Sequence, residues 1–464
     1  MGVTSALAAL TLLLAAPQPG AAGIGDAYYP DYGNGGYDVD HYDIRLHYQP
    51  ATDELAGTTT LRATTTQALS SFDLDFVLQV SAVQVDGRPA RFTRQGDHEL
   101  VVTPARPLPR HHTMTVRVTY ADVPSTALGE GFTVWNRTPD GALAAGEPEI
   151  AWWWFPSNDH PKDKATFDVA VTVPDGVEAI SNGTMPRPPA PASPGWTTWT
   201  WHESSPMTTY AAQLAIGQYD IEQTRAPNGR PVIYAYSRLL TPELAAAARQ
   251  SVSRTAEIVQ WESTLFGPYP FDAEGGVVPP PGVWFGALEN QTRPTYAAKE
   301  FQRGPDTAVV AHENAHQWFG DAVSLSRWQD IWLNEAFATY TEWLWSEHEG
   351  SISAQQNFDE LYNGIPADDP MWLLPIGDPG VPPITYEVYL RGAMTMHQLR
   401  RTVGDAAFFA ILRTWYAEHR GGNATTPQFI ALAERVSGKQ LRAFFQAWLF
   451  TPAKPSVPPT AAGG

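Results

Sequence analysis

The chain has 464 residues, enough for two or three domains with substantial cores, and 43% of the residues are hydrophobic. Its formal net charge of −19 argues against a nucleic-acid partner, because phosphate binding needs a basic face. The absence of cysteine excludes disulfides and thiolate metal sites. A globular protein is expected, and its 17 tryptophans suggest aromatic-lined surfaces or clefts.

Residues 1–23 resemble a secretory signal peptide. An uncharged apolar run from Val3 to Ala16 is followed by small residues, and cleavage is expected around Ala21 to Gly23. The run is shorter than the roughly 18 to 20 residues that a membrane span requires, and no later segment is long and apolar enough to span. The sequence therefore predicts a secreted, extracellular protein without a membrane span once the signal is removed.

Residues 37–219 are typical of an all-β, sandwich-like domain. Short alternating runs rich in Val and Thr, such as YDIRLHY and HTMTVRVTY, are separated by turns such as Asp86-Gly87. The proline-rich stretch from Met185 to Trp196 cannot hold a central strand, because proline lacks the donor that the ladder needs. A long exposed loop is expected there.

Residues 220–450 predict a mixed, mainly helical α/β domain. Thr241 as N-cap, Pro242 at the first helical position and Gly267 as a stop predict a helix across 241–267. Helical patterns continue to about Phe450. The proline-rich residues 451–464 are expected to form a disordered tail.

The stretch HENAHQWFGD begins with an H-E-x-x-H motif. Positions i and i+4 share one face of a helix, so His312 and His316 can bind one metal ion. Glu335, 19 positions after His316 in the helical pattern WLNEAFATY, can supply the third protein ligand of a catalytic zinc site. Zinc lowers the pKa of its bound water towards about 7, and Glu313 would take the proton and pass it to the leaving amine. The alternative is a chance coincidence of core histidines and surface glutamates.

These residues resemble the zinc aminopeptidases of the aminopeptidase N type, gluzincins that include leukotriene hydrolase. HENAHQWFGD followed by WLNEAFATY is similar to the H-E-x-x-H-x18-E signature of that family, and FGALEN is similar to its Gly-x-Met-Glu-Asn motif, with Leu288 where Met is usual. WFPSNDHPKDKATFDV resembles the family's β domain, with Ser157 where Cys is common. The resemblance implies an N-terminal β domain at 37–219 and a thermolysin-like zinc peptidase domain at 220–450.

The resemblance also implies roles for further residues. Glu289 and Glu147 would hold the free α-ammonium of a substrate, so that only the first peptide bond reaches the metal. Tyr389, in YLRG, would donate a hydrogen bond to the developing oxyanion. The substrate-binding set implied in this way is Glu289, Glu147, Gly286, Ala287 and Asn290.

Two of these assignments have nearby competitors. Glu149 lies two positions after Glu147 and could take its place. Tyr386 competes with Tyr389, although Arg391-Gly392 follows Tyr389 in the register of the family pattern.

The chain also departs from the family. Trp152, Trp153 and Trp154 occupy a stretch where the family often has an Arg. Only about 75 residues follow Tyr389, so no large C-terminal helical domain is expected to close over the site. Asp330 and Asn334 could orient the metal ligands, as carboxylates and amides near metal sites often do.

The sequence thus predicts a secreted, monomeric zinc aminopeptidase that holds one zinc ion and acts on peptides with a free N-terminus. A zinc endopeptidase on the same site, a hydrolase of a non-peptide substrate such as an epoxide, and a catalytically inactive zinc-binding protein remain as alternatives. Intact Glu313 and Tyr389 argue against the last of these, since a purely structural site does not need a general base.

Overall fold

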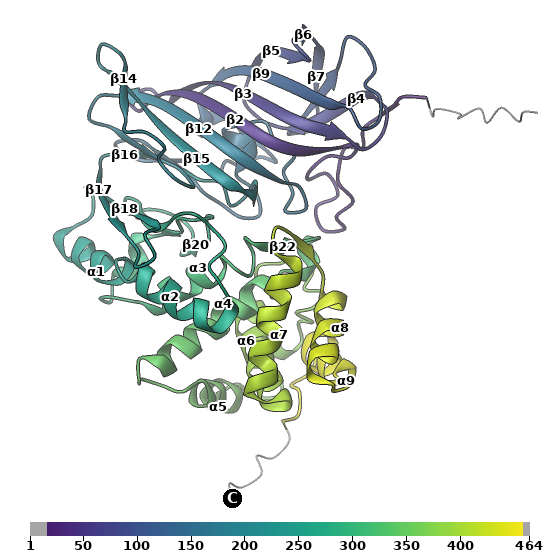
Figure 1. Cartoon of the computed structure of the whole chain (residues 1–464), viewed down its shortest axis with the longest axis vertical. Coiled ribbons are helices and arrows are strands. Elements are labelled where there is room, and N and C mark those ends of the chain that lie inside the picture. Colours follow the sequence, from purple (N-terminus) through teal and green to yellow (C-terminus); the bar gives the residue numbers. More distant parts are fainter. Residues whose placement is uncertain (1–15, 458–464) are drawn as a thin grey trace, which may run out of the picture.

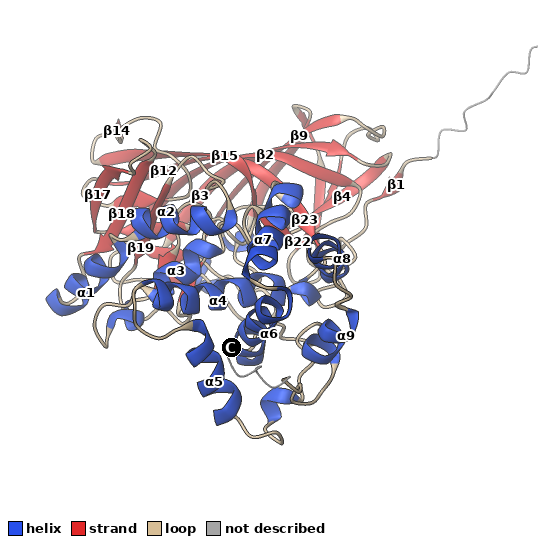
Figure 2. Cartoon of the chain, turned by 60° about the horizontal axis from the view of Figure 1, so that its bottom comes forward, coloured by secondary structure: helices blue, strands red, loops and turns tan. Residues whose placement is uncertain are grey.

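The computed structural model describes residues 16–457. A broad β domain lies against a mainly helical domain, with the large sheet on one side of the molecule and the labelled helices on the other (Figures 1 and 2). This arrangement confirms the predicted fold class, an all-β domain followed by a mixed, mainly helical one. None of the helices between residues 16 and 457 is long and apolar enough to cross a membrane.

An eight-stranded sheet dominates the β domain. In β2 (Tyr37–Gln49), Tyr42, Ile44, Leu46 and Tyr48 are buried, whereas residues between them are more exposed, as expected for a sheet with one face on a core. The other strands, in spatial order around β2, are β14 (Ala190–Ser193), β15 (Trp196–Thr208), β12 (Lys164–Pro174), then β3 (Glu54–Thr65), β9 (Thr113–Asp122), β5 (Val80–Val85) and β6 (Arg88–Pro89).

Two four-stranded sheets share the hydrophobic core of the large sheet, which makes the domain sandwich-like. The first contains β1 (Gln18–Pro19), β4 (Leu69–Asp75), β8 (Glu99–Thr103) and β7 (Arg91–Gln95). The second contains β10 (Asn136–Arg137), β11 (Ala142–Ala144), β16 (Leu214–Gly217) and β13 (Glu178–Ile180). Of the predicted signal peptide, residues 1–15 lie outside the described residues, and Gln18–Pro19 pair with β4.

The helical domain has a five-stranded sheet and a group of helices. The sheet order is β17 (Tyr219–Arg225), β18 (Pro231–Ser237), β19 (Glu274–Val278), β21 (Thr295–Tyr296) and β20 (Ala287–Leu288). The helices are α1 (Pro242–Val252), α2 (Thr255–Phe266), α3 (Ala308–Ala315), α4 (Trp332–His348), α5 (Ala354–Gly364), α6 (Tyr386–Val403), α7 (Asp405–His419), α8 (Thr426–Ser437) and α9 (Arg442–Phe445). A small sheet pairs β22 (Val323–Leu325) with β23 (Gly422–Ala424). Helix α4 is buried along most of its length and packs on α3 and α6.

The stretch 241–267 forms two helices, α1 and α2, and the prediction of a single helix is therefore wrong. Thr241 is the N-cap, and its hydroxyl accepts a hydrogen bond from the backbone N–H of Leu244. The break follows Val252, whose carbonyl accepts a 2.7 Å hydrogen bond from the Thr255 hydroxyl. Such local hydrogen bonds compete with the helical ladder and interrupt it.

Two predicted loops also differ from the structure. Residues 190–193, within the proline-rich stretch, form β14 at the edge of the large sheet, where proline is tolerated. Residues 451–457 are ordered, in contrast to the predicted disordered tail, whose residues 458–464 lie outside the described part. The Lys454 ammonium lies 4.2 Å from the Tyr362 ring centroid and donates a 2.8 Å hydrogen bond to the Ile365 carbonyl.

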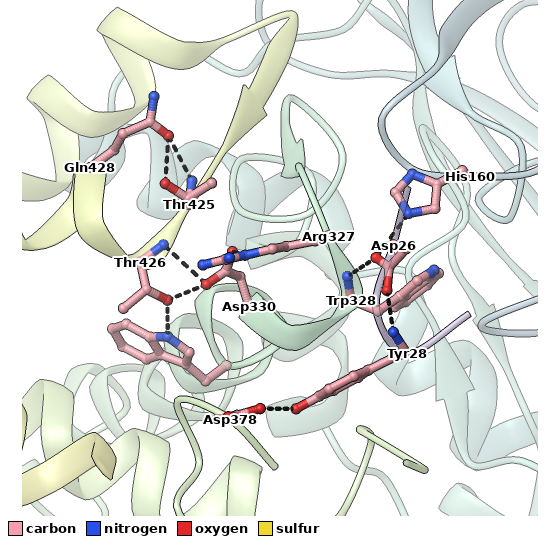
Figure 3. Close-up of polar contacts among 11 residues, drawn as sticks. Asp26, Tyr28, His160, Arg327, Trp328, Asp330, Asp378, Thr425, Thr426 and Gln428 are labelled. Atoms are coloured by element: carbon pink, nitrogen blue, oxygen red, sulfur yellow. Dashed lines mark hydrogen bonds and ion pairs between the residues drawn. The ribbon is translucent and has the colours of Figure 1, made fainter. Parts of the chain in front are cut away.

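Residues 24–36 form a strap between the two domains. The carboxylate of Asp26 lies 3.0 Å from His160 Nε2 in the β domain and accepts a 2.8 Å hydrogen bond from the backbone N–H of Trp328 in the helical domain. The Tyr28 hydroxyl donates to Asp378 and accepts a 2.8 Å hydrogen bond from the backbone N–H of Gly380. Figure 3 shows Asp26 between His160 and Trp328, so this short segment bonds to both domains.

Candidate metal centre and active site

His312, His316 and Glu335 converge at the contact between α3 and α4. The Nε2 atoms of both histidines lie 3.6 Å from the same atom, Oε2 of Glu335. All three side chains are buried, and their ligand atoms lie within 4.8 Å of one another. The predicted triad is therefore assembled, with two nitrogens and one oxygen facing a common point.

Hydrogen bonds behind the two imidazole rings fix their orientation. His312 Nδ1 lies 2.6 Å from Glu342 Oε1, and His316 Nδ1 lies 3.1 Å from the backbone carbonyl of Phe319. Both contacts place a proton on Nδ1, so that each Nε2 presents its lone pair towards Glu335. Glu342 was not predicted, although it follows Glu335 by seven positions and so lies on the same face of α4.

Glu313 lies beside the metal ligands. It is buried, and an oxygen of its carboxylate lies within 4.8 Å of ligand atoms of His316 and Glu289. Burial raises the pKa of Glu313 to about 8, although the neighbouring histidines counteract this effect. A carboxylate with a raised pKa beside a metal site is suited to receiving a proton near neutral pH.

Glu289 follows the edge strand β20 and is held by the β domain. The hydroxyl of Tyr210 donates a 2.9 Å hydrogen bond to Glu289 Oε1. Behind the carboxylate, the Gln317 side chain donates a 3.2 Å hydrogen bond to the backbone carbonyl of Glu289. Tyr210 therefore orients the carboxylate and Gln317 holds its backbone, with one carboxylate oxygen left for a further partner.

The structure distinguishes Glu147 from Glu149. Burial raises the pKa of Glu147, and the carboxylates that raise it further are chiefly those of Glu289, Glu335 and Glu313. Burial also raises the pKa of Glu149, to about 7, but its acidic neighbours include Asp159, away from the metal ligands. Glu147 is therefore the carboxylate that the β domain directs towards the metal centre.

Tyr389 and Tyr386 also differ clearly in their position relative to the metal ligands. The ring of Tyr389 lies nearly parallel to that of His312, with the centroids 6.0 Å apart, and burial together with Glu335 raises the pKa of its phenol. Tyr386, one turn earlier in α6, is 69% exposed. The protonated phenol of Tyr389 is therefore the one placed beside the metal ligands.

Comparison with known proteins identifies the family. The model of the peptidase M1 N-terminal domain matches residues 38–211, and that of the peptidase family M1 domain matches residues 251–448. The crystal structure of an M1 zinc metallopeptidase from Deinococcus radiodurans is 30% identical, with a TM-score of 0.80, over 94% of this chain and 98% of that one. The chain belongs to peptidase family M1.

Other M1 relatives extend the comparison. A mutant of the Deinococcus radiodurans M1 zinc metallopeptidase, bound to a Tyr-Ser-Ala substrate, is 28% identical with a TM-score of 0.78, over 94% of this chain and 99% of that one. Aminopeptidase N of Streptomyces lividans is 29% identical over 322 residues, which are 64% of this chain and 36% of that protein. The chain thus spans about a third of the length of the curated relatives that it matches.

The residues of the M1 metal site fit a single zinc ion. Tetrahedral zinc with bonds of about 2.0–2.2 Å separates its ligand atoms by roughly 3.3–3.6 Å, close to the 3.6 Å found for both His–Glu pairs. Oε2 of Glu335 is also buried without a hydrogen-bond partner among residues 16–457, as expected for an atom reserved for a metal. His312, His316 and Glu335 therefore form the zinc site of this M1 protein.

The remaining predicted residues occupy the rim of the site or its support. Gly286 and Ala287 lie on or beside β20, which is the edge of the five-stranded sheet and can pair with an extended peptide. The side chain of Asn290 is directed inwards instead, where it accepts a 2.7 Å hydrogen bond from Thr295 Oγ1 and donates to the Ala211 carbonyl. Its role is to hold the turn that presents Glu289.

The two suggested supporting residues differ in position. The Asp330 carboxylate accepts a 2.6 Å hydrogen bond from the Thr426 hydroxyl and a 2.7 Å bond from Arg327, so it links α8 to the start of α4 (Figure 3). The Asn334 amide nitrogen is buried without a partner in the described part of the chain. Neither residue contacts the zinc ligands through a hydrogen bond, and the imidazoles are oriented by Glu342 and the Phe319 carbonyl.

Tyr210 and Asp321 are functional-site residues that the sequence did not reveal. Tyr210 is far from the metal-binding motifs along the chain, so no local pattern marks it. Asp321 is fully buried, its carboxylate has no hydrogen-bond partner in the described residues, and burial together with Glu289 raises its pKa. Both residues interact with Glu289, Tyr210 by donating a hydrogen bond and Asp321 by adding a further carboxyl group to this M1 site.

Proposed function

We propose that this M1 protein is a zinc aminopeptidase that removes single residues from the N-terminus of peptides. The main support is the position of Glu289, whose carboxylate lies within 4.8 Å of ligand atoms of Glu313 and His316. Glu147, supplied by the β domain, interacts electrostatically with Glu289 and Glu335, so an ammonium group bound by Glu289 and Glu147 lies at a short distance from the zinc. Only the first peptide bond of a substrate then reaches the reacting groups.

The chain's own residues supply the remaining chemistry. Zinc held by His312, His316 and Glu335 supplies Lewis acidity, which activates water and polarises a carbonyl group. Glu313 takes the proton from the attacking water and delivers it to the leaving amine. The Tyr389 hydroxyl donates a hydrogen bond to the oxygen that becomes negatively charged in the transition state.

The assay that tests this function compares aminoacyl anilides whose amino group is free or acetylated. Cleavage of the free forms alone, abolished by a zinc chelator and restored by zinc, is expected. Cleavage of the acetylated forms as well would favour an endopeptidase, because no ammonium would then be required. Failure to cleave either form, with zinc bound, would favour a non-peptide substrate or an inactive zinc-binding protein.

We also propose that the chain is exported, on the basis of the apolar run from Val3 to Ala16. Cleavage around Ala21 to Gly23 would remove β1, a strand of only two residues. Mass spectrometry of the protein recovered from culture medium would test this, with loss of about the first 21 to 23 residues expected from the signal pattern. An intact N-terminus on the protein, found only inside cells, would refute it.

A further inference from the structure

The β domain contains a second buried cluster of potential metal ligands, formed by Asp75, His98 and Glu99. Asp75 ends β4 and Glu99 begins β8, and the two residues lie directly opposite each other in the antiparallel register. The side chains of Asp75, His98 and Glu99 are only 0%, 3% and 7% exposed. Like charges directly opposite each other on one sheet face destabilise the pair, so something must offset this arrangement.

The geometry of the cluster resembles that of the zinc site in the same molecule. His98 Nε2 lies 3.6 Å from Asp75 Oδ1 and 3.9 Å from Glu99 Oε1, compared with 3.6 Å for each histidine and Glu335. The backbone carbonyl of Asp31, on the strap, lies 3.0 Å from the same nitrogen. The ligand atoms of Asp75, His98 and Glu99 lie within 4.8 Å of one another, a spacing that a single metal ion can bridge, and the Asp31 carbonyl is next to the nitrogen.

Hydrogen bonding leaves the inward-facing oxygens of the cluster free. Asp75 Oδ2 accepts hydrogen bonds of 3.1 Å from the Asn34 side chain and 2.7 Å from the backbone N–H of Asp159. Asp75 Oδ1 and both oxygens of Glu99 have no hydrogen-bond partner among residues 16–457. Within that range, the ion pairs of both carboxylates involve His98 alone. Buried carboxylates of this kind need a proton or a bound cation.

We propose that Asp75, His98 and Glu99, with the Asp31 carbonyl, bind a small divalent transition-metal ion such as Zn²⁺ or Mn²⁺. One imidazole among oxygen ligands suits these ions, whereas Ca²⁺ takes oxygen ligands alone. Because Asp31 belongs to the strap, the ion fastens residues 24–36 to the sheet of β4 and β8. Its function is structural, and it is separate from the catalytic zinc.

The competing occupant is a proton. Burial, with Asp73 nearby, raises the pKa of Glu99 to about 8, so a protonated Glu99 would also relieve the repulsion. The two occupants differ in the number of metal ions that the folded chain retains.

Metal content distinguishes them. The full chain is equilibrated with Zn²⁺ or Mn²⁺, desalted, and analysed by inductively coupled plasma mass spectrometry. We expect two ions per chain in the wild type, falling to one in Glu99→Gln and to one in the double variant His312→Ala/His316→Ala. Glu203→Gln, which changes another buried glutamate of the β domain, is the matched control and should retain two. A single ion in the wild type, or two in Glu99→Gln, would overturn the proposal.

Thermal unfolding provides a second measurement that does not depend on whether Glu99→Gln folds. The double variant His312→Ala/His316→Ala lacks the catalytic imidazoles, so any remaining specific site is the one in the β domain. Its unfolding midpoint should rise as Zn²⁺ or Mn²⁺ is added and respond little to Ca²⁺, because an ion that binds only the folded state stabilises it. A midpoint unchanged by either transition metal would contradict the proposal.

Discussion

At the scale of single residues, Glu313 is proposed to transfer protons without being a metal ligand. Its carboxylate is near His316 and Glu289 but is not part of the His312–His316–Glu335 triad. We predict that Glu313→Gln keeps close to one catalytic zinc per chain and lowers kcat by about 10²- to 10⁴-fold, the usual contribution of a general base. Metal analysis and initial rates on the same preparation measure both quantities. Loss of the zinc in this variant would show that Glu313 supports the metal instead.

Glu147 and Glu149 form a matched pair for testing the ammonium site. A lost hydrogen bond to a charged group costs about 1.5–3 kcal/mol, so we predict that Glu147→Gln weakens kcat/KM for free aminoacyl anilides by about 10- to 100-fold. Glu149→Gln should change this value by much less, because Glu149 faces Asp159. Equal losses in both variants would assign the effect to the folding of this segment.

The sequence predicts some of these residues and not others for identifiable reasons. His312, His316 and Glu313 lie in one helical turn, so their spacing alone indicates a metal site. Glu289, Glu147 and Tyr389 depend on a family resemblance, because nothing in their local sequence points to the metal. Tyr210 and the Phe319 carbonyl act through tertiary contacts that only the folded chain creates.

At the scale of elements, the strap at residues 24–36 makes a pH-dependent contribution to stability. Burial raises the pKa of Asp26, but hydrogen bonds from His160 and the backbone N–H groups of Trp328 and Tyr28 outweigh it and lower the pKa below 3.8. A carboxyl whose folded pKa is lowered stabilises the fold above its unfolded pKa, and this contribution is lost as the pH falls through the folded pKa.

We therefore predict that Asp26→Ala lowers the free energy of unfolding at pH 7 by about 1–3 kcal/mol, since it leaves His160 and the Trp328 N–H without their buried hydrogen-bond partner. The difference between variant and wild type should shrink below about pH 4. Urea unfolding at several pH values measures both effects. Asp31→Ala, at an exposed side chain of the same strap, is the control. A difference independent of pH would refute the role assigned to the carboxylate.

The break between α1 and α2 and the strand β14 were not predicted, because both depend on contacts with residues outside the local sequence. The periodicity of residues 241–267 suits a helix throughout, yet Arg254 forms ion pairs of 2.7 Å with Glu257 and 2.6 Å with Glu349 at the break between α1 and α2. Glu349 lies beyond the end of α4, so no window around Arg254 contains it. Similarly, β14 forms because β15 offers it an edge, and its own proline-rich sequence gives no sign of pairing.

At the scale of the whole molecule, many tryptophans lie in the cores, although Trp284 is 57% exposed. Trp152, Trp153, Trp154, Trp318, Trp328 and Trp332 are all almost completely buried, and they fill the cores and the contact between domains instead of lining an open cleft. Glu147 belongs to the β domain and Glu289 to the helical domain, and Trp328 contacts Tyr210 across the two domains, with ring centroids 5.5 Å apart. The proposed ammonium site therefore exists only in the assembled two-domain unit.

The complete site leads to a prediction about pH. The ammonium form of the substrate is required by Glu289 and Glu147, and an α-amino group loses its proton near pH 7.7–8.0. The alkaline limb of kcat/KM should therefore follow the pKa of the substrate amine. With a substrate whose amine pKa is lower by about one unit, kcat/KM should fall at a pH about one unit lower. If an enzyme group such as the Tyr389 phenol caused the fall, its pH would be the same for both substrates. Rates over pH 6 to 10 for two such substrates decide between these origins. If both substrates gave the same alkaline limb, the substrate ammonium would not be the group that determines which bond this M1 protein cleaves.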